Sequence, residues 1–346
     1  MFQVDKLAAL LKDGSFEKEV TPQDLHFLRG YKWNSLVGFN TAVKKFLKFM
    51  NSKGRLPFRL PVDEETIYEF CFWAGRDEDT LTGQEIAAST LGKYLHGIQV
   101  WHIYHKATYP GTVDKRVKIL LRSSARVDAT VAAKPKKGAV HLNHMVHLAK
   151  SLLQGGQKEQ AILDLAITAF WGMARLGELT YPLPNDLQKA PETLLTSDMT
   201  LRELTNGAKA ILAPKRKNRK AWRNPAYLSE RLREANYEET SLFGYRGPNG
   251  VRVHLTKDVV TRTLAAVWAE GNFSGISGHS FRVGGASLRN AWGVPIDEIC
   301  TLGRWVSECY KLYIRPYSAK ELSDSVTLME DLDLSWEASS KQNLSI

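Results

Sequence analysis

The sequence has few cysteines and no long apolar runs. Its 346 residues include three cysteines, Cys71, Cys300 and Cys309, too few for a disulfide framework, and none forms a C-x-x-C pair with metal-ligand spacing. We expect the three thiols to be buried in a protein of a reducing compartment. No apolar run approaches the ~20 residues of a membrane helix, and the first residues lack the basic start and cleavage site of a secretory signal. These absences predict an intracellular protein that does not span a membrane, nuclear in a eukaryote and otherwise in the cytoplasm or nucleoid.

What the sequence has in excess is positive charge. Lys and Arg number 47 against 37 Asp and Glu, which gives a formal net charge of +10 at pH 7. A surplus of this size favours a polyanionic partner such as nucleic acid or an anionic membrane surface. Hydrophobic residues make up 43% of the chain, which is typical of globular proteins, and its length favours two domains.

The first third of the chain has helical periodicity. Between residues 23 and 54, apolar residues at spacings of three and four form one helical face: Leu25, Leu28, Trp33, Leu36, Phe39, Val43, Phe46 and Phe49. Further helices are predicted within 63–75, 87–107 and 111–128, with no strand alternation. Residues 129–141, ATVAAKPKKGAVH, are small, basic and interrupted by Pro and Gly. This composition is typical of a linker between two domains.

The second part combines helices with one hairpin. Two strands are predicted within 199–207 and 208–220, and Asn206-Gly207 at their junction is a strong turn signal. Helices are predicted around this hairpin at 141–154, 158–173, 256–271, 280–293, 295–305 and 307–318. Three histidines at the start of this part, His141, His144 and His147, have no nearby Cys or acid to complete a metal site. We expect them on a helix surface.

Four short stretches of the second part carry groups suited to chemistry on a phosphate. ARLGEL places Arg175 one helical turn before Glu178, and HSFR holds a histidine three residues before an arginine. APKRKNRK puts lysines at the end of the second hairpin strand, and GRWVSECYKLYIRP places Trp305 eight residues before Tyr313. Each stretch alone is common, but their order along one chain is specific.

Phosphoryl transfer on DNA would use these groups in complementary ways. Arg175 and Arg282 present planar guanidinium groups that suit the oxygens of a phosphate. A hairpin lysine can protonate a leaving 5′-oxygen, and a tyrosine can form a covalent bond to phosphorus that stores the bond energy for religation. His279 would help to deprotonate the tyrosine or bind the phosphate.

In this order the motifs resemble those of the tyrosine recombinases, the phage-integrase family. The resemblance covers residues 140–320, where HSFRVGG, NAWGVPIDEI, GRW and LYIR match family runs, and Cre recombinase has the most similar runs. It implies a mainly α fold with a small β-hairpin sheet, in a two-domain, C-shaped clamp. The parts would be an all-helical core-binding domain (1–130), a linker (131–139), the catalytic domain (140–320) and a C-terminal tail (321–346).

The resemblance implies a site-specific DNA recombinase, or integrase, that works through a 3′-phosphotyrosine without metal or ATP and needs no cofactor. Its catalytic set would be Arg175, Arg282, His279, Glu178, which orients the site, Trp305, which stands where most relatives have His, and Tyr313, the nucleophile. Two other outcomes stay open: a type IB topoisomerase-like strand transferase, and a catalytically silent DNA-binding protein derived from a recombinase.

Two residue assignments have alternatives. The gap from Trp305 to Tyr313 is one residue shorter than usual in the family and resembles that of eukaryotic mobile elements such as Cryptons. Tyr310 is therefore an alternative nucleophile, although YIR after Tyr313 favours the latter. Strand alternation puts Lys215 and Lys217 on one face. Comparison with the family's hairpin favours Lys217 as the general acid.

The expected partner is double-stranded DNA with an inverted-repeat target site, bound by a homotetramer. Helix 91–106 is a candidate for the major groove. Other candidate DNA contacts are Lys215, the linker lysines Lys134, Lys136 and Lys137, and the pair Arg252 and Lys257. Residues 323–338 would be a helix exchanged between protomers or a disordered acidic tail.

Overall fold

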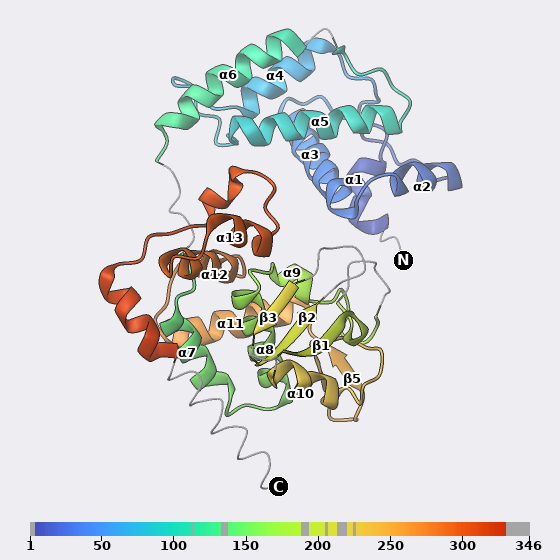
Figure 1. Cartoon of the computed structure of the whole chain (residues 1–346). Coiled ribbons are helices and arrows are strands. Elements are labelled where there is room, and N and C mark those ends of the chain that lie inside the picture. The colour runs from blue at the N-terminus through green and yellow to red at the C-terminus, as the bar shows by residue number, and fades with distance from the viewer. Residues whose placement is uncertain are drawn as a thin grey trace. The chain divides into compact units, whose positions relative to one another are not determined.

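The computed structural model describes residues 4–111, 114–132, 138–187, 194–204, 207–212, 220–223 and 226–329. The chain divides into two compact units, Met1–Pro135 and Lys136–Ile346 (Figure 1). This division falls inside the predicted linker, residues 131–139. Each unit encloses its own apolar core.

Helices and no β-strand form the regular elements of the first unit among its described residues, as predicted. Its elements in chain order are η1 (Val4–Leu7), α1 (Ala8–Leu11), α2 (Pro22–Arg29), α3 (Trp33–Ser52), α4 (Glu64–Ala74), α5 (Ala88–Tyr104) and α6 (Asp114–Thr130). The single helical face expected over 23–54 belongs to two helices, because the chain turns between Arg29 and Trp33. Thr21 caps α2 by accepting from the Asp24 amide at 3.2 Å, and Pro22 follows at the first helical position.

Two close contacts hold the first unit together. The buried Asn40 side chain on α3 accepts hydrogen bonds from the amides of Ala9 and Leu10, each at 2.9 Å, and so fixes α1. Helix α5 crosses α3 at Gly97, where a Cβ would lie 2.8 Å from the Cβ of Ala42. The absence of a side chain on Gly97 therefore lets the backbones of α3 and α5 approach closely. One side of α5 remains exposed and carries Lys93.

The second unit is built around a buried helix. Its helices are α7 (Leu142–Leu152), α8 (Gln157–Trp171), α9 (Leu176–Leu179), η3 (Thr196–Asp198), α10 (Ala226–Glu234), α11 (Lys257–Glu270), α12 (Ser280–Ala291), α13 (Ile296–Gly303) and η4 (Glu308–Leu312). Most of α8 is buried, and α7, α9, α10 and α12 pack on it. Residues 319–329 form a further helix.

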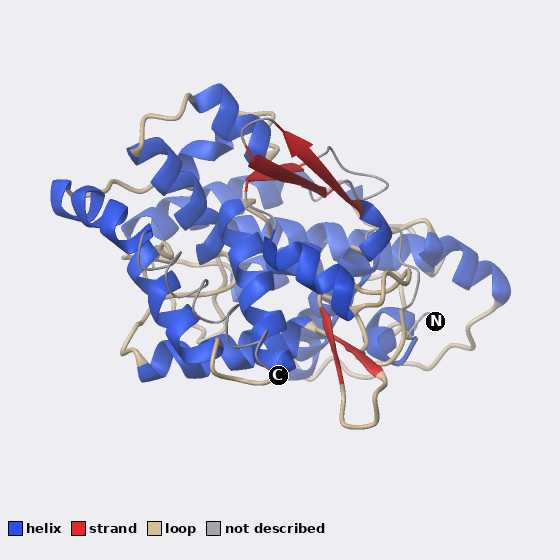
Figure 2. Cartoon of the chain, turned by 60° about the horizontal axis from the view of Figure 1, so that its bottom comes forward, coloured by secondary structure: helices blue, strands red, loops and turns tan. Residues whose placement is uncertain are grey.

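Two small antiparallel sheets complete this unit (Figure 2). Strands β1 (Met199–Leu204) and β2 (Gly207–Leu212) form the predicted hairpin, with Leu204 opposite Gly207, and β3 (Lys220–Arg223) adds to β2. Strands β4 (Gly244–Arg246) and β5 (Arg252–His254) form a second hairpin that was not predicted. With three residues each, β4 and β5 are too short to display an alternating pattern. The predicted class, mainly α with a small sheet, is confirmed.

The helix predicted over 307–318 is wrong. The chain forms only the 3-10 turn η4, then runs extended to Ser318. Pro316 explains the break, because it lacks an amide hydrogen and disfavours helical geometry at the preceding residue. The Arg315 amide donates instead to Ser287 Oγ at 2.8 Å.

The helix at 319–329 packs on its own chain. Ser325 is 1% exposed and its hydroxyl accepts from Trp292 Nε1 at 3.1 Å, while Leu328 and Met329 pack on the main core. Residues 323–329 of the predicted exchanged segment are thus part of an intramolecular contact. The remainder, 330–338, lies outside the described residues.

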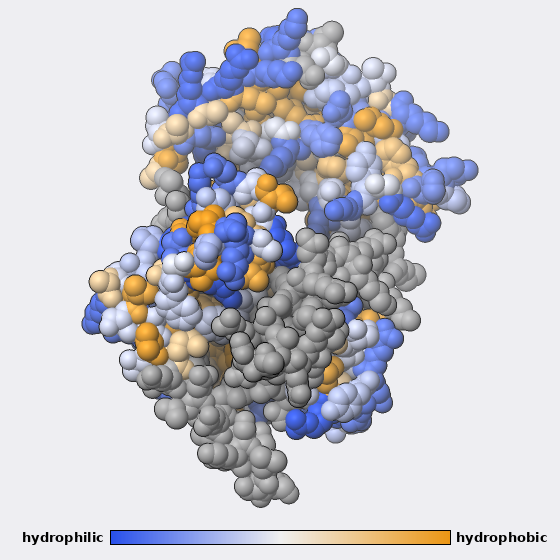
Figure 3. All heavy atoms as spheres, in the orientation of Figure 1, coloured by the Kyte–Doolittle hydropathy of each residue, from blue (hydrophilic) through white to orange (hydrophobic). Residues whose placement is uncertain are grey.

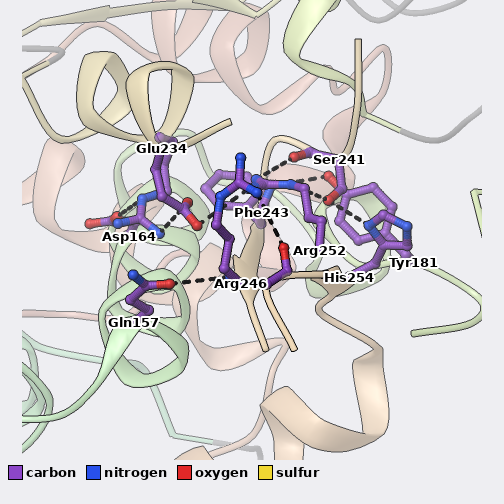
Figure 4. A network of polar contacts seen from close by, with 11 residues as sticks. Gln157, Asp164, Tyr181, Glu234, Ser241, Phe243, Arg246, Arg252 and His254 are labelled. Atoms are coloured by element: carbon purple, nitrogen blue, oxygen red, sulfur yellow. Dashed lines mark hydrogen bonds and ion pairs between the residues drawn. The ribbon is translucent and has the colours of Figure 1, made fainter. Parts of the chain in front are cut away.

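A buried ion-pair network joins α8, α10 and β5 (Figure 4). Asp164 on α8 pairs with Arg231 on α10 at 2.8 Å, and Arg231 also pairs with Glu234 at 3.1 Å. Arg252 pairs with Glu234 at 3.3 Å and donates to the carbonyl of Ser241 at 2.8 Å. Because the partners are buried, removing one would leave a charge uncompensated, so the network fixes the second hairpin on the core.

Two consecutive glycines let α12 approach its neighbours. A Cβ on Gly284 would lie 1.9 Å from the carbonyl oxygen of Val140, and one on Gly285 would lie 2.0 Å from that of Phe170 on α8. No side chain fits at either position. The run HSFRVGG therefore includes a packing requirement as well as chemical groups.

We predict that Gly285→Ala lowers the free energy of unfolding by more than about 2 kcal/mol, because backbone must move to accept the methyl group. Gly177→Ala is the matched control in the same unit, since a Cβ there meets nothing within 4 Å. It should leave stability unchanged or raise it by up to about 1 kcal/mol. Denaturant titration measures both, and equal stabilities would contradict the packing argument.

Candidate functional site

Arg282 lies at the centre of the predicted site. It sits in the first turn of α12 with 1% of its surface exposed. One terminal nitrogen donates to the carbonyl of Met173 at 2.7 Å, and the other donates to the carbonyl of Gly303. Gly303 is the last residue of α13, where a helix leaves carbonyl groups unpaired and favours a cation, and Met173 lies two residues beyond the end of α8. Arg282 thereby joins three helices.

Aromatic rings surround this guanidinium. Its central carbon lies 4.6 Å from the ring centre of Trp305 and 5.3 Å from that of Tyr313. The ring of Tyr313 lies 4.7 Å from Trp305 and 5.0 Å from His279, centre to centre. A Cβ on Gly303 would lie 2.3 Å from the Trp305 ring, so only glycine leaves room for the indole. Four predicted site residues, from two of the four stretches, therefore lie together.

The predicted pair of Arg175 and Glu178 begins α9. Arg175 is the residue before the helix, and its amide donates to Glu178 Oε2 at 3.3 Å. The Arg175 guanidinium donates to Glu178 Oε1 at 3.0 Å while its side chain remains 56% exposed. Glu178 therefore holds Arg175 at the start of α9 without burying the guanidinium.

Arg304 is a site residue that the sequence reasoning missed. It donates to Glu178 Oε2, so that this carboxylate lies between two arginines. Its backbone has φ 57°, the left-handed region, at the C-terminal end of α13. The available signal was the arginine inside GRW, directly before Trp305, but sequence alone does not indicate what it contacts.

The site carries a surplus of positive charge. Burial lowers the pKa of the Arg282 guanidinium, and Arg175 and Arg304 lower it further, whereas Glu178 and Tyr313 raise it. Arginine nevertheless stays charged in proteins. Three guanidinium groups against one carboxylate leave two positive charges in excess.

Several hydrogen-bond donors of the site are buried without a partner among the described residues. They are Nε of Arg282, Nε of Arg304 and Nε1 of Trp305. Buried donors are normally paired, and all three belong to the positively charged cluster. Oxygens of an anion are the acceptors that such a set of donors would bind.

Of the predicted lysines, the structure describes only one. Lys215, Lys217, Lys134, Lys136 and Lys137 lie outside the described residues. Lys257 is exposed as the first residue of α11.

Arg252, which was predicted to contact DNA, has partners within its own chain. The Arg252 guanidinium already pairs with Glu234 and the carbonyl of Ser241 inside the network of Figure 4. We assign Arg252 to the support of the second hairpin.

The three histidines predicted on a helix surface are half-buried. His144 lies 4.4 Å from the ring centre of Phe273, and burial lowers its pKa to about 4. His141 stacks on Tyr317 at 4.7 Å. The prediction of surface histidines is therefore wrong, because α7 packs this face against α11 and the residues that follow it. In the described part of the chain, no group of three or more His, Cys, Asp or Glu side chains is arranged to hold a metal ion.

Only one of the three cysteines is fully buried. Cys71 is buried, which raises the pKa of its thiol to about 12. Cys300 and Cys309 are half-buried and pack with Trp305 and Tyr313. The expectation of three buried thiols thus holds for Cys71 alone. Among the described residues, no helix is both long enough and apolar enough to span a membrane.

No family model matches the sequence, and no curated protein matches it. Solved structures do resemble the chain. The XerH site-specific recombinase bound to its difH substrate, as a pre-cleavage complex, is 14% identical, with 86% of this chain and 80% of that chain covered and a TM-score of 0.52. The Tn1549 transposon integrase (residues 82–397) in complex with circular intermediate DNA is 10% identical, with 89% and 97% covered and a TM-score of 0.50. The likeness shows that this chain shares their fold.

The contacts of the two arginines predict unequal effects on the free energy of unfolding. Arg282→Met leaves two buried carbonyls without their donor and should lower the free energy of unfolding by at least about 2 kcal/mol. Arg175→Met removes a mostly exposed ion pair and should change it by less than about 1 kcal/mol. Denaturant unfolding of both variants tests this contrast. An Arg282 variant as stable as the parent chain would refute the bridging role.

Proposed function

We propose that this protein is a site-specific DNA recombinase that cleaves and rejoins DNA through a 3′-phosphotyrosine intermediate, without metal or ATP. The main observation behind this proposal is one cluster with an excess of positive charge. It contains Arg282, Trp305, His279 and Tyr313. The fold shared with the XerH recombinase and the Tn1549 integrase supports the proposal.

In the proposed reaction, the Tyr313 oxygen attacks the phosphorus of one strand. The bond from phosphorus to the 5′-oxygen breaks, and the 5′-oxygen takes a proton from Lys217. The phenol proton passes to His279 or to water. Negative charge develops on the non-bridging oxygens, and Arg175 and Arg282 stabilise it. A 5′-hydroxyl of another strand then reverses these steps and releases the tyrosine.

The unpartnered donors fit this chemistry. Nε of Arg282 and Nε1 of Trp305 are N–H groups without an acceptor in the described structure. An oxygen of the phosphate would satisfy them, and its charge would offset the repulsion between the arginines. Donors that are placed before the substrate arrives need not reorganise in the transition state.

DNA is the proposed partner of both units, which would close on a duplex as a clamp. Phosphate contacts by Lys and Arg would supply most of the affinity, so binding should weaken steeply with salt. On α5, Lys93, His96 and Gln99 are exposed on one side and are candidates for the major groove.

Recombination joins two duplexes, so four protomers would act on an inverted-repeat site. Side chains on and after α13 expose hydrophobic surface: Ile296, Val306 and Leu312 (Figure 3). A tail segment beyond residue 329 of a neighbouring protomer is the proposed occupant. The Cre-like motifs and the short Trp305–Tyr313 spacing further suggest an enzyme of a mobile element.

The nucleophile can be identified with a trapped intermediate. Duplexes bound by the protein are first selected from a random library, and a nick is placed near the scissile bond of the selected site so that the cleaved strand diffuses away. We expect a covalent adduct with the parent chain and with Tyr310→Phe, and none with Tyr313→Phe, because only the Tyr313 ring lies against both His279 and Trp305 in the proposed site.

Denaturing electrophoresis measures the adduct. An adduct that disappears with Tyr310→Phe instead would transfer the role to that residue. Binding without any adduct from the parent chain would indicate a silent DNA-binding protein. Relaxation of supercoiled DNA by a monomer, without strand exchange between sites, would indicate a topoisomerase-like enzyme.

The general acid can be separated from its neighbour by changing the leaving group. A thiolate leaves without protonation, so a 5′-bridging phosphorothiolate substrate bypasses a general acid. We predict that Lys217→Ala cleaves the ordinary substrate about 100-fold more slowly but regains the parent rate on the phosphorothiolate. Lys215→Ala, the matched control, should be equally affected on both substrates. Rescue of Lys215→Ala alone would exchange the two assignments.

A further inference from the structure

Arg304 occupies a position that a bulky side chain rarely takes. Its φ of 57° lies in the left-handed region at the end of α13, where Gly or Asn is favoured because a Cβ is strained. The side chain is nevertheless largely buried, with 17% exposed. A long charged residue in such a place indicates that the side chain has a purpose that local geometry does not supply.

The contact of Arg304 is with Glu178 Oε2, while Arg175 binds Oε1 of the same carboxylate. The two arginines differ in exposure, since the Arg175 side chain is 56% exposed. Glu178 is thus anchored from the buried side by Arg304. The exposed Arg175 guanidinium can leave Oε1 for another anion without leaving the carboxylate unpaired.

Glu178 Oε2 accepts from Arg304 and from the Arg175 amide. Without Arg304, this oxygen would also be open to the Arg175 guanidinium, which already binds Oε1. A carboxylate facing a single arginine forms a two-bond, planar pair. Such a pair would compete with a phosphate for the Arg175 guanidinium. The shared arrangement prevents this pairing and keeps Arg175 at a fixed place.

We propose that Arg304 is a positioning residue, which holds Glu178 so that the Arg175 guanidinium is free to bind the scissile phosphate. This inference rests on the proposed function. It links the end of α13, which carries Trp305, to the start of α9, which carries Arg175. DNA cleavage thus depends on a residue that acts through Glu178.

The test uses variants that suit the left-handed backbone. Arg304→Asn and Arg304→Gly relieve backbone strain, so both should fold with a melting temperature near or above that of the parent. Arg304→Lys keeps the positive charge and the same strained, left-handed backbone conformation. On the selected nicked duplex, we expect the single-turnover cleavage rate of the Asn and Gly variants to fall about 10- to 100-fold. DNA affinity should stay within about 2-fold, and Lys should recover part of the rate.

A double-substitution cycle separates positioning from direct phosphate contact. If Arg304 acts through Glu178, adding Arg304→Asn to Glu178→Gln should slow cleavage by less than about 2-fold. If the rate loss of the double variant equals the product of the two single losses, Arg304 acts independently of Glu178 and the proposal is overturned. Parent-like cleavage by Arg304→Asn would also overturn it. Absence of any adduct from the parent chain would instead overturn the proposed function, and this inference with it.

Discussion

The buried guanidinium of Arg282 is the group on which the rest of the site depends. It donates to carbonyls at the ends of α8 and α13 while belonging to α12 itself. Without it, the buried carbonyls of Met173 and Gly303 would lose this donor, at a cost comparable to a lost hydrogen bond. One charged side chain therefore completes the packing of three helices and sets the location of the residues after α13.

The consequence is a site whose parts are far apart in sequence and fixed in space. Gly303 leaves room for Trp305, and the chain that follows returns Tyr313 to the side of His279. Glu178 adds α9 through its shared contact with Arg304. Arg282 and Glu178 lie within helices, and the other groups lie at or next to helix ends. The packing of these helices in the second unit therefore sets the geometry of the site.

Charge explains why such a site suits an anion. Three guanidinium groups face one carboxylate, and burial together with repulsion from Arg175 and Arg304 lowers the pKa of Arg282. Buried N–H donors on Arg282, Arg304 and Trp305 have no acceptor among the described residues. Both features cost free energy, and an oxyanion bound there would relieve both.

The sequence by itself determined the local structure with a clear signal: the helices, the hairpin at Asn206-Gly207, and the types and order of the site residues. Those signals arise from contacts between residues near in the chain. Only the tertiary structure decided which of these groups meet. Arg304 and Arg252 are alike as sequence, yet one contacts Glu178 in the site and the other supports a hairpin. Burial of His144 and the break after η4 likewise follow from packing and from chain direction. A partner from a distant segment leaves no periodic trace in the sequence, because long-range contacts are set by how whole helices pack.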